Sequence, residues 1–81
     1  MNNNADEFTL EVSSDLDYEK MVINLYFSNN HIAILDCDEG IDKAKIAILD
    51  RYTDNIVWSF DYQNFIQSLK LAYEKLKEVN N

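Results

Sequence analysis

The sequence predicts an α+β fold, in which an antiparallel meander sheet of four or five strands packs on one C-terminal helix. Every segment with clear period-two alternation of apolar residues precedes the only segment with clear helical spacing. The change from one period to the other falls within residues 56–65, next to the only tryptophan, Trp58. An order of strands first and one closing helix is typical of a small sheet with a helix on one face.

Five segments alternate in the manner of strands. They are residues 8–12, 18–27, 31–37, 43–49 and 56–60. Ser28-Asn29-Asn30 predicts a hairpin turn, because asparagine tolerates the positive φ that tight turns require. Gly40 is the only glycine and there is no proline, so Asn and Asp must make most of the other turns.

The closing helix is predicted over residues 61–78. Asp61 suits the N-cap position, because its carboxylate can accept from the free amides of the first turn and complements the helix dipole. An apolar stripe follows at helical spacing, made of Phe65, Leu69, Ala72 and Leu76 and widened by Ile66 and Tyr73. We expect this stripe to cover the sheet face made of Met21, Ile23, Leu25, Ile32, Ile34, Ile46, Ile48, Trp58 and Phe60. The chain is then a single domain, 1–81, with a flexible leader (1–6), a sheet (7–60) and a helix (61–78).

One helix cannot cover both faces of the sheet. The face expected to stay open carries Val22, Tyr26, Ala33, Leu35, Ala47, Leu49 and Val57, mixed with Asn24, Lys45 and Ser59. A partly apolar open face favours a homodimer or another partner, because contiguous apolar patches rarely stay exposed. The alternative is that the leader or the first strand folds across it. Tyr26, beside the hairpin turn, is the best candidate for an interface anchor, since tyrosine is enriched at binding hot spots.

The formal net charge is −8, and residues 1–19 hold six acidic residues and no basic one. This distribution disfavours direct binding to nucleic acid or to an anionic membrane, because phosphates require a basic surface. A partner protein with a basic contact surface fits better, while the alternative is that the acidity only aids solubility. No apolar stretch approaches the ~20 residues of a membrane-spanning helix, and no signal peptide is expected. Cys37 is the only cysteine and favours a reducing compartment, so we expect a cytoplasmic protein.

Four carboxylates crowd the end of the third predicted strand and the following loop: Asp36, Asp38, Glu39 and Asp42. Their spacing does not match a calcium-binding EF-hand, since Gly40 at the invariant glycine position would make Leu35 the first ligand. We therefore predict no metal, no cofactor and no catalytic residue. The four carboxylates and Tyr26 are instead candidate partner-binding residues. A solvated loop and a small carboxylate-based metal-binding module stay open as alternatives.

From Tyr18 onward the chain resembles small bacterial immunity proteins that are encoded beside secreted or contact-dependent toxins. The similar segments are Tyr18-Glu19-Lys20-Met21-Val22, Ile23 to Phe27, Ile32-Ala33-Ile34-Leu35, Asp38-Glu39-Gly40-Ile41-Asp42, and Trp58-Ser59-Phe60-Asp61 with Leu69, Ala72, Lys75 and Leu76 in the helix. The resemblance implies a cytosolic, non-enzymatic protein that binds and neutralises a cognate toxin. An alternative is a phage-type inhibitor of a nucleic-acid-handling enzyme, which would act as a crude phosphate mimic.

Overall fold

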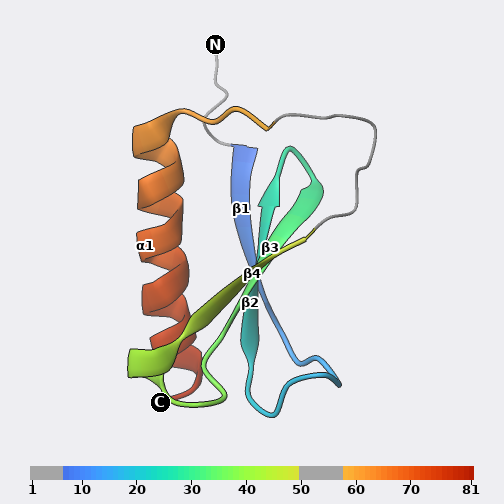
Figure 1. The fold of residues 1–81 in the computed structure, drawn as a ribbon, viewed down its shortest axis with the longest axis vertical. Coiled ribbons are helices and arrows are strands. Elements are labelled where there is room, and N and C mark those ends of the chain that lie inside the picture. The colour runs from blue at the N-terminus through green and yellow to red at the C-terminus, as the bar shows by residue number, and fades with distance from the viewer. Residues whose placement is uncertain (1–6, 50–57) are drawn as a thin grey trace.

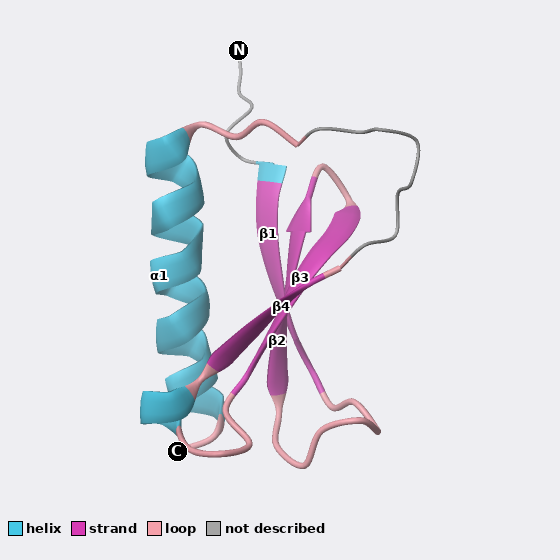
Figure 2. Ribbon diagram, viewed as in Figure 1, coloured by secondary structure: helices cyan, strands magenta, loops and turns pink. Residues whose placement is uncertain are grey.

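The computed structural model describes residues 7–49 and 58–81. The described residues form one four-stranded sheet and one α-helix. Figure 1 shows the long helix lying against the sheet, and Figure 2 shows the same view by type of secondary structure. The elements are β1 (Phe8–Ser13), β2 (Val22–Phe27), β3 (Asn30–Asp36), a short 3-10 helix η2 (Ile41–Lys43), β4 (Lys45–Ile48) and α1 (Tyr62–Val79). The strands are antiparallel to their neighbours and lie in chain order, β1-β2-β3-β4. The predicted α+β meander with one C-terminal helix is confirmed.

Two strand predictions need correction. Residues 58–60 lack strand structure, while residues 56 and 57 of the predicted fifth strand, like the leader 1–6, lie outside the described residues. The second strand begins at Val22 and not at residue 18. The reason lies in Asp38, whose carboxylate accepts the backbone N–H groups of Glu19 (3.1 Å) and Lys20 (3.0 Å), so neither amide is available to a strand ladder.

The hairpin between β2 and β3 turns at Ser28 and Asn29, as predicted. Both residues have positive φ, 49° and 69°, which matches the right-handed twist of the two strands they connect. The side-chain amide of Asn30 donates to the carbonyl oxygens of Phe27 (3.2 Å) and Ser28 (3.3 Å), so the turn also satisfies its own backbone.

From Ala33 to Leu35 the helix covers a different face of β3 from the one predicted, whereas Ile32, predicted on the covered face, does lie in a cluster with Phe65 and Leu69 of the helix. Leu35 lies opposite Ile23 and Ala33 lies opposite Leu25, so these two residues of β3, and not Ile34, point toward α1. A register shift between Leu25 and Tyr26 brings Tyr26 opposite His31 and leaves Ile32 as an extra, buried residue. The prediction was wrong here because Ile32 to Leu35 is apolar on both faces, so alternation does not say which face is inside.

Two clusters of buried side chains form the core between α1 and the sheet. Ala72 and Leu76 of α1 are fully buried against Ile23, Leu35 and Cys37. The free thiol of Cys37 is therefore a core residue just beyond β3. The second cluster is Leu25, Ile32 and Ala33, packed against Phe8, Leu10, Phe27, Phe60, Phe65 and Leu69. Together the clusters account for most of the buried apolar side chains among the described residues.

Specific hydrogen bonds fix both ends of α1. The Asp61 carboxylate accepts the backbone N–H of Asn64 at 3.0 Å, which confirms Asp61 as the N-cap. At the other end the Asn80 side chain hydrogen-bonds to both backbone groups of Met21, at 3.0 Å and 2.9 Å. The helix packs mainly on β1, β2 and β3. Ile46 and Ile48, on the helix side of β4, consequently stay 44% and 70% exposed.

Candidate interaction surface

The predicted carboxylates lie at one end of the sheet, where β3 ends. Asp38 binds the loop between β1 and β2 through its two backbone hydrogen bonds, so that loop joins the same end of the molecule. The loop contributes three more carboxylates, those of Asp15, Asp17 and Glu19. The structure thus places part of the acidic N-terminal run beside the acidic loop, a proximity that the sequence did not reveal. We call this region, residues 15–19 and 36–42, the acidic end.

Leu16 lies at the tip of the acidic end and is completely exposed, with a relative accessibility of 104%. The loop around it is ordered by local hydrogen bonds. The Tyr18 N–H donates to the Asp15 carbonyl oxygen (3.0 Å), and the Asp17 N–H donates to the Asp15 carboxylate (2.9 Å). Leu16 is therefore a large apolar side chain held in water between two carboxylates, a feature that sequence reasoning missed because a lone leucine in a polar loop carries no periodic signal.

Tyr18 reports the electrostatics of the acidic end. Desolvation by partial burial raises the pKa of its phenol, and the negative charges of Asp36, Asp15, Asp17 and Asp38 raise it further. All four carboxylates act in the same direction, because each disfavours a second negative charge. The acidic end is thus a region of negative potential built from two separate segments of the chain.

Glu39 and Asp42 complete the predicted acidic set. Glu39 forms an ion pair with Lys45 at 2.7 Å, and both side chains are about 60% exposed, at 61% and 62%. This hydrogen bond and the charge of Glu39 raise the pKa of the Lys45 ammonium group. Asp42 lies in η2 and is exposed. Lys45 therefore offsets part of the charge on the β4 side of the acidic end.

Tyr26 lies apart from the acidic end. It occupies the far end of β2, about 14 Å along the sheet from the level of Asp36 at ~3.4 Å per residue. Its hydroxyl donates to a Glu11 carboxylate oxygen at 3.2 Å, and its ring stacks on that of His31 with centroids 4.7 Å apart. The predicted anchor and the predicted carboxylates thus belong to two different surfaces.

A polar network covers the open face of β1 to β3. The Asn24 side-chain amide is buried and donates to Glu11 (3.3 Å) and Ser13 (3.0 Å), while its oxygen lies 3.1 Å from His31 Nε2. Because both N–H groups of Asn24 are used and its oxygen can only accept, His31 Nε2 must carry a proton. Tyr26 closes the network through Glu11. The open face is thus organised by hydrogen bonds, and Ala33 and Leu35, expected there, lie on the helix side.

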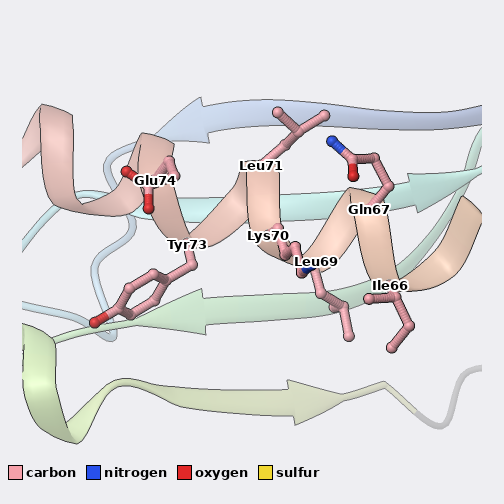
Figure 3. Close-up of a pocket in the computed structure, with 7 residues that line it drawn as sticks. All are labelled: Ile66, Gln67, Leu69, Lys70, Leu71, Tyr73 and Glu74. Atoms are coloured by element: carbon pink, nitrogen blue, oxygen red, sulfur yellow. The ribbon is translucent and has the colours of Figure 1, made fainter. Parts of the chain in front are cut away.

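Two of the hollows along α1 are shallow and mainly apolar. The groove in Figure 3 has a volume of about 540 Å³, and Ile66, Leu69 and Tyr73 point from the helix toward the side of β3 and β4. A second hollow, of about 320 Å³, lies between Tyr73 and Leu69 on α1 and Ile46 on β4. Within residues 7–49 and 58–81, no group of three His, Cys, Asp or Glu side chains is arranged to hold a metal ion.

Searches against protein-family models, curated proteins and solved structures found no match to the chain. In the part of the chain that the structure describes, no helix has the length and apolar character needed to cross a bilayer.

Proposed function

We propose that the protein is a non-enzymatic immunity protein, which binds a cognate bacterial toxin in the cytoplasm and neutralises it. The family resemblance of residues 18–77 suggests this class. The observation that carries the proposal is the acidic end. There, fully exposed Leu16 lies between Asp15 and Asp17, in the loop that Asp38 holds through two backbone hydrogen bonds. Such a surface can bind a partner protein without an internal pocket in this protein.

Leu16 has the properties of an interface anchor. An exposed leucine loses contact with water when it enters an apolar pocket of a partner, a transfer that stabilises a complex by about 1.5–3 kcal/mol. Because the loop is already held by hydrogen bonds to Asp15 and Asp38, little conformational entropy is lost on binding. The loop therefore holds the Leu16 side chain in its exposed position before a partner binds.

The carboxylates around Leu16 define the chemistry of the partner. Its pocket should be ringed by lysine or arginine, since complementary charge accelerates encounter and rejects wrong partners. A toxin that acts on nucleic acid supplies such a surface through its phosphate-binding residues. Association should then slow as the salt concentration rises, because exposed charges are screened beyond about 8 Å at physiological ionic strength.

The first test is purification of the tagged protein from its native cells with identification of the proteins that bind it. Purified partner is then titrated with the wild type, with Leu16→Ala and with the control Leu71→Ala, which removes a half-exposed leucine from α1. We expect Leu16→Ala to weaken binding by roughly 10- to 30-fold, as hot-spot truncations do, and Leu71→Ala to change it little. Equal affinity for all three proteins would remove Leu16 from the interface.

Neutralisation itself is tested by co-expression. A toxin that stops growth alone should be tolerated when the wild type is present and less well tolerated with Leu16→Ala.

Other outcomes would favour the alternatives. If the captured partner is a host or phage enzyme that handles nucleic acid and has no toxicity, the result favours a phage-type inhibitor over an immunity protein. Tight stoichiometric binding of calcium, magnesium or manganese in calorimetry would instead favour the metal-binding alternative. The partner-binding roles of Tyr26, Asp36, Asp38, Glu39 and Asp42 remain part of the proposal, and an alanine variant of each is compared with the wild type in the same titration.

A further inference from the structure

β4 is the last strand of the sheet, and no described residue pairs with its outer edge. The Leu49 N–H donates to the Ile32 carbonyl oxygen at 2.9 Å, so the backbone groups of Leu49 point toward β3. In an antiparallel strand this direction alternates, and the backbone groups of Lys45 and Ala47 must point the same way. The N–H and C=O groups of Ile46 and Ile48 therefore point outward, where they have no partner among the described strands.

The side chains of β4 divide in the same regular way. Ile46 lies opposite Leu35 and Ile48 opposite Ala33, so both isoleucines lie on the helix side of the sheet. They are 44% and 70% exposed, because α1 does not extend over β4. Ala47 lies on the other face and is exposed. An edge strand with outward backbone groups and exposed isoleucines is a template for another strand.

We propose that two copies of this chain associate edge to edge through β4, with the strands antiparallel and the two-fold axis at Ala47. In this register Ile46 of one copy pairs with Ile48 of the second copy, and the outward groups of both residues form four interchain hydrogen bonds. The two Ala47 residues face each other as a close pair without hydrogen bonds, a position that suits a small side chain. The four isoleucines meet on the helix side and continue the apolar hollow beside Tyr73.

The charge of this segment favours a second copy as the occupant. Residues 43–49 contain two lysines and no acidic residue, in a chain whose net charge is −8. Repulsion between two molecules is therefore weaker at this segment, which lies between Asp42 and Asp50, than the net charge of the chain implies. Lys45 is held by Glu39 at 2.7 Å, and in the proposed register it faces Leu49 of the second copy, so Lys45 meets no like charge within the paired strands. The opposite edge, β1, carries Glu11 and is followed by Asp15, which disfavours pairing of two copies there.

The short length of β4, four residues, sets the strength of the dimer. Such an interface belongs to the small, transient class that buries less than about 1,200 Å². We therefore expect a monomer–dimer equilibrium with a dissociation constant in the range of roughly 10 μM to 1 mM.

Sedimentation equilibrium on the purified full chain at several concentrations tests the association, and a charge exchange at Ala47 tests its register. Ala47→Glu and Ala47→Lys each place like charges face to face across the axis, and should each weaken self-association at least about fivefold. An equimolar mixture should restore association, because Glu then faces Lys. Both variants should keep the wild-type circular dichroism spectrum, since Ala47 is exposed.

Two results would overturn the proposal. One is a wild type that stays monomeric up to about 1 mM. The other is a dimer whose affinity is unchanged in both variants or is not recovered on mixing, since only an axis at Ala47 makes the two charges face each other.

Discussion

The contact between Asn80 and Met21 offers a sharp test of what holds the helix on the sheet. Asn80 follows α1 directly, and its oxygen accepts the Met21 N–H at 3.0 Å while its amide donates to the Met21 carbonyl oxygen at 2.9 Å. The amide also donates to the Leu76 carbonyl oxygen at 3.1 Å, one of the free carbonyls at the helix end. One side chain thus joins the helix C-terminus to the beginning of β2, 59 positions earlier.

Replacement of Asn80 by alanine removes all three hydrogen bonds at a partly buried site. Each such bond contributes about 0.5–1.5 kcal/mol net, so we expect Asn80→Ala to lower the free energy of unfolding by about 2–3 kcal/mol. For a domain of this size that corresponds to a fall in Tm of roughly 8–24 °C. Asn80→Asp keeps the acceptor but loses both donors and adds a negative charge at the negative end of the helix dipole. It should be at least as destabilising at neutral pH.

Urea denaturation followed by circular dichroism measures these differences, with Asn81→Ala as the matched control. Asn81 is exposed and makes no side-chain contact comparable with that of Asn80, so its replacement should change stability by less than about 0.5 kcal/mol. If Asn80→Ala is as stable as Asn81→Ala, the bidentate contact does not hold the helix end, and packing of Leu76 must be sufficient.

Three further predictions concern single groups. Gly40 has φ 114°, and an added Cβ would lie 3.0 Å from an Asp42 carboxylate oxygen, so Gly40→Ala should destabilise the fold by about 1–2 kcal/mol in urea denaturation. Asp61→Ala should lose about 1 kcal/mol through the missing N-cap, whereas Asp61→Asn should lose only a few tenths, and equal losses would contradict the capping role. The pKa of Tyr18 is raised in the folded state, so its un-ionised form stabilises the fold below pH ~10 and this contribution disappears as the pH rises through the higher folded pKa. The loss of stability above pH ~10 should accordingly be smaller in Tyr18→Phe, and an ultraviolet difference titration of the two proteins should show Tyr18 ionising above the usual range.

The sequence was sufficient for the fold class and for most of the elements. The helix could be placed because its apolar stripe, from Phe65 to Leu76, is long and periodic, and because Asp61 combines a capping side chain with a favourable charge. The hairpin could be placed because Ser28-Asn29-Asn30 is typical of a tight turn. These are local signals, and each lies within one continuous segment of the chain.

Long-range features could not be predicted in the same way. The face of β3 depends on the register shift between Leu25 and Tyr26, which no pattern in an apolar strand announces. The start of β2 depends on Asp38, which lies 18 residues beyond Lys20. The polar network depends on the pairing of Glu11 with Asn24 across two strands. In each case the feature depends on a contact with a residue distant in the chain, and neither composition nor spacing predicts that contact.

The same limit separates the candidate site into a predictable and an unpredictable part. The crowding of Asp36, Asp38 and Glu39 is visible in the sequence because these residues are neighbours. Their proximity to Leu16 is not, since it follows from the hydrogen bonds of Asp38 to the β1–β2 loop. Tyr26 is predicted as an anchor from its residue type and from its position beside the hairpin turn on the open face, and the structure places it at the other end of β2 from the carboxylates. The residues that share a surface are determined by the fold, and here the sequence predicted only the adjacent charged residues.

The width of the sheet connects the two proposed surfaces. Four strands about 4.8 Å apart span roughly 14 Å between their axes, whereas one helix is about 10 Å across, so a single helix leaves an edge strand uncovered. Here that strand is β4, and its N-terminal end adjoins the acidic end through the Lys45–Glu39 ion pair.

Antiparallel pairing about Ala47 would place the two acidic ends at opposite ends of the joined sheet. Each Leu16 would then stay free to bind its own partner, and repulsion between the acidic ends would be smallest. A complex saturated with the proposed partner protein should consequently contain two copies of each protein at concentrations where the dimer forms, and one of each in Ala47→Glu. Sedimentation at equal concentration compares the complex of the wild type with that of Ala47→Glu. The same stoichiometry in both complexes would show that the β4 edge and the Leu16 surface are not used together in this arrangement.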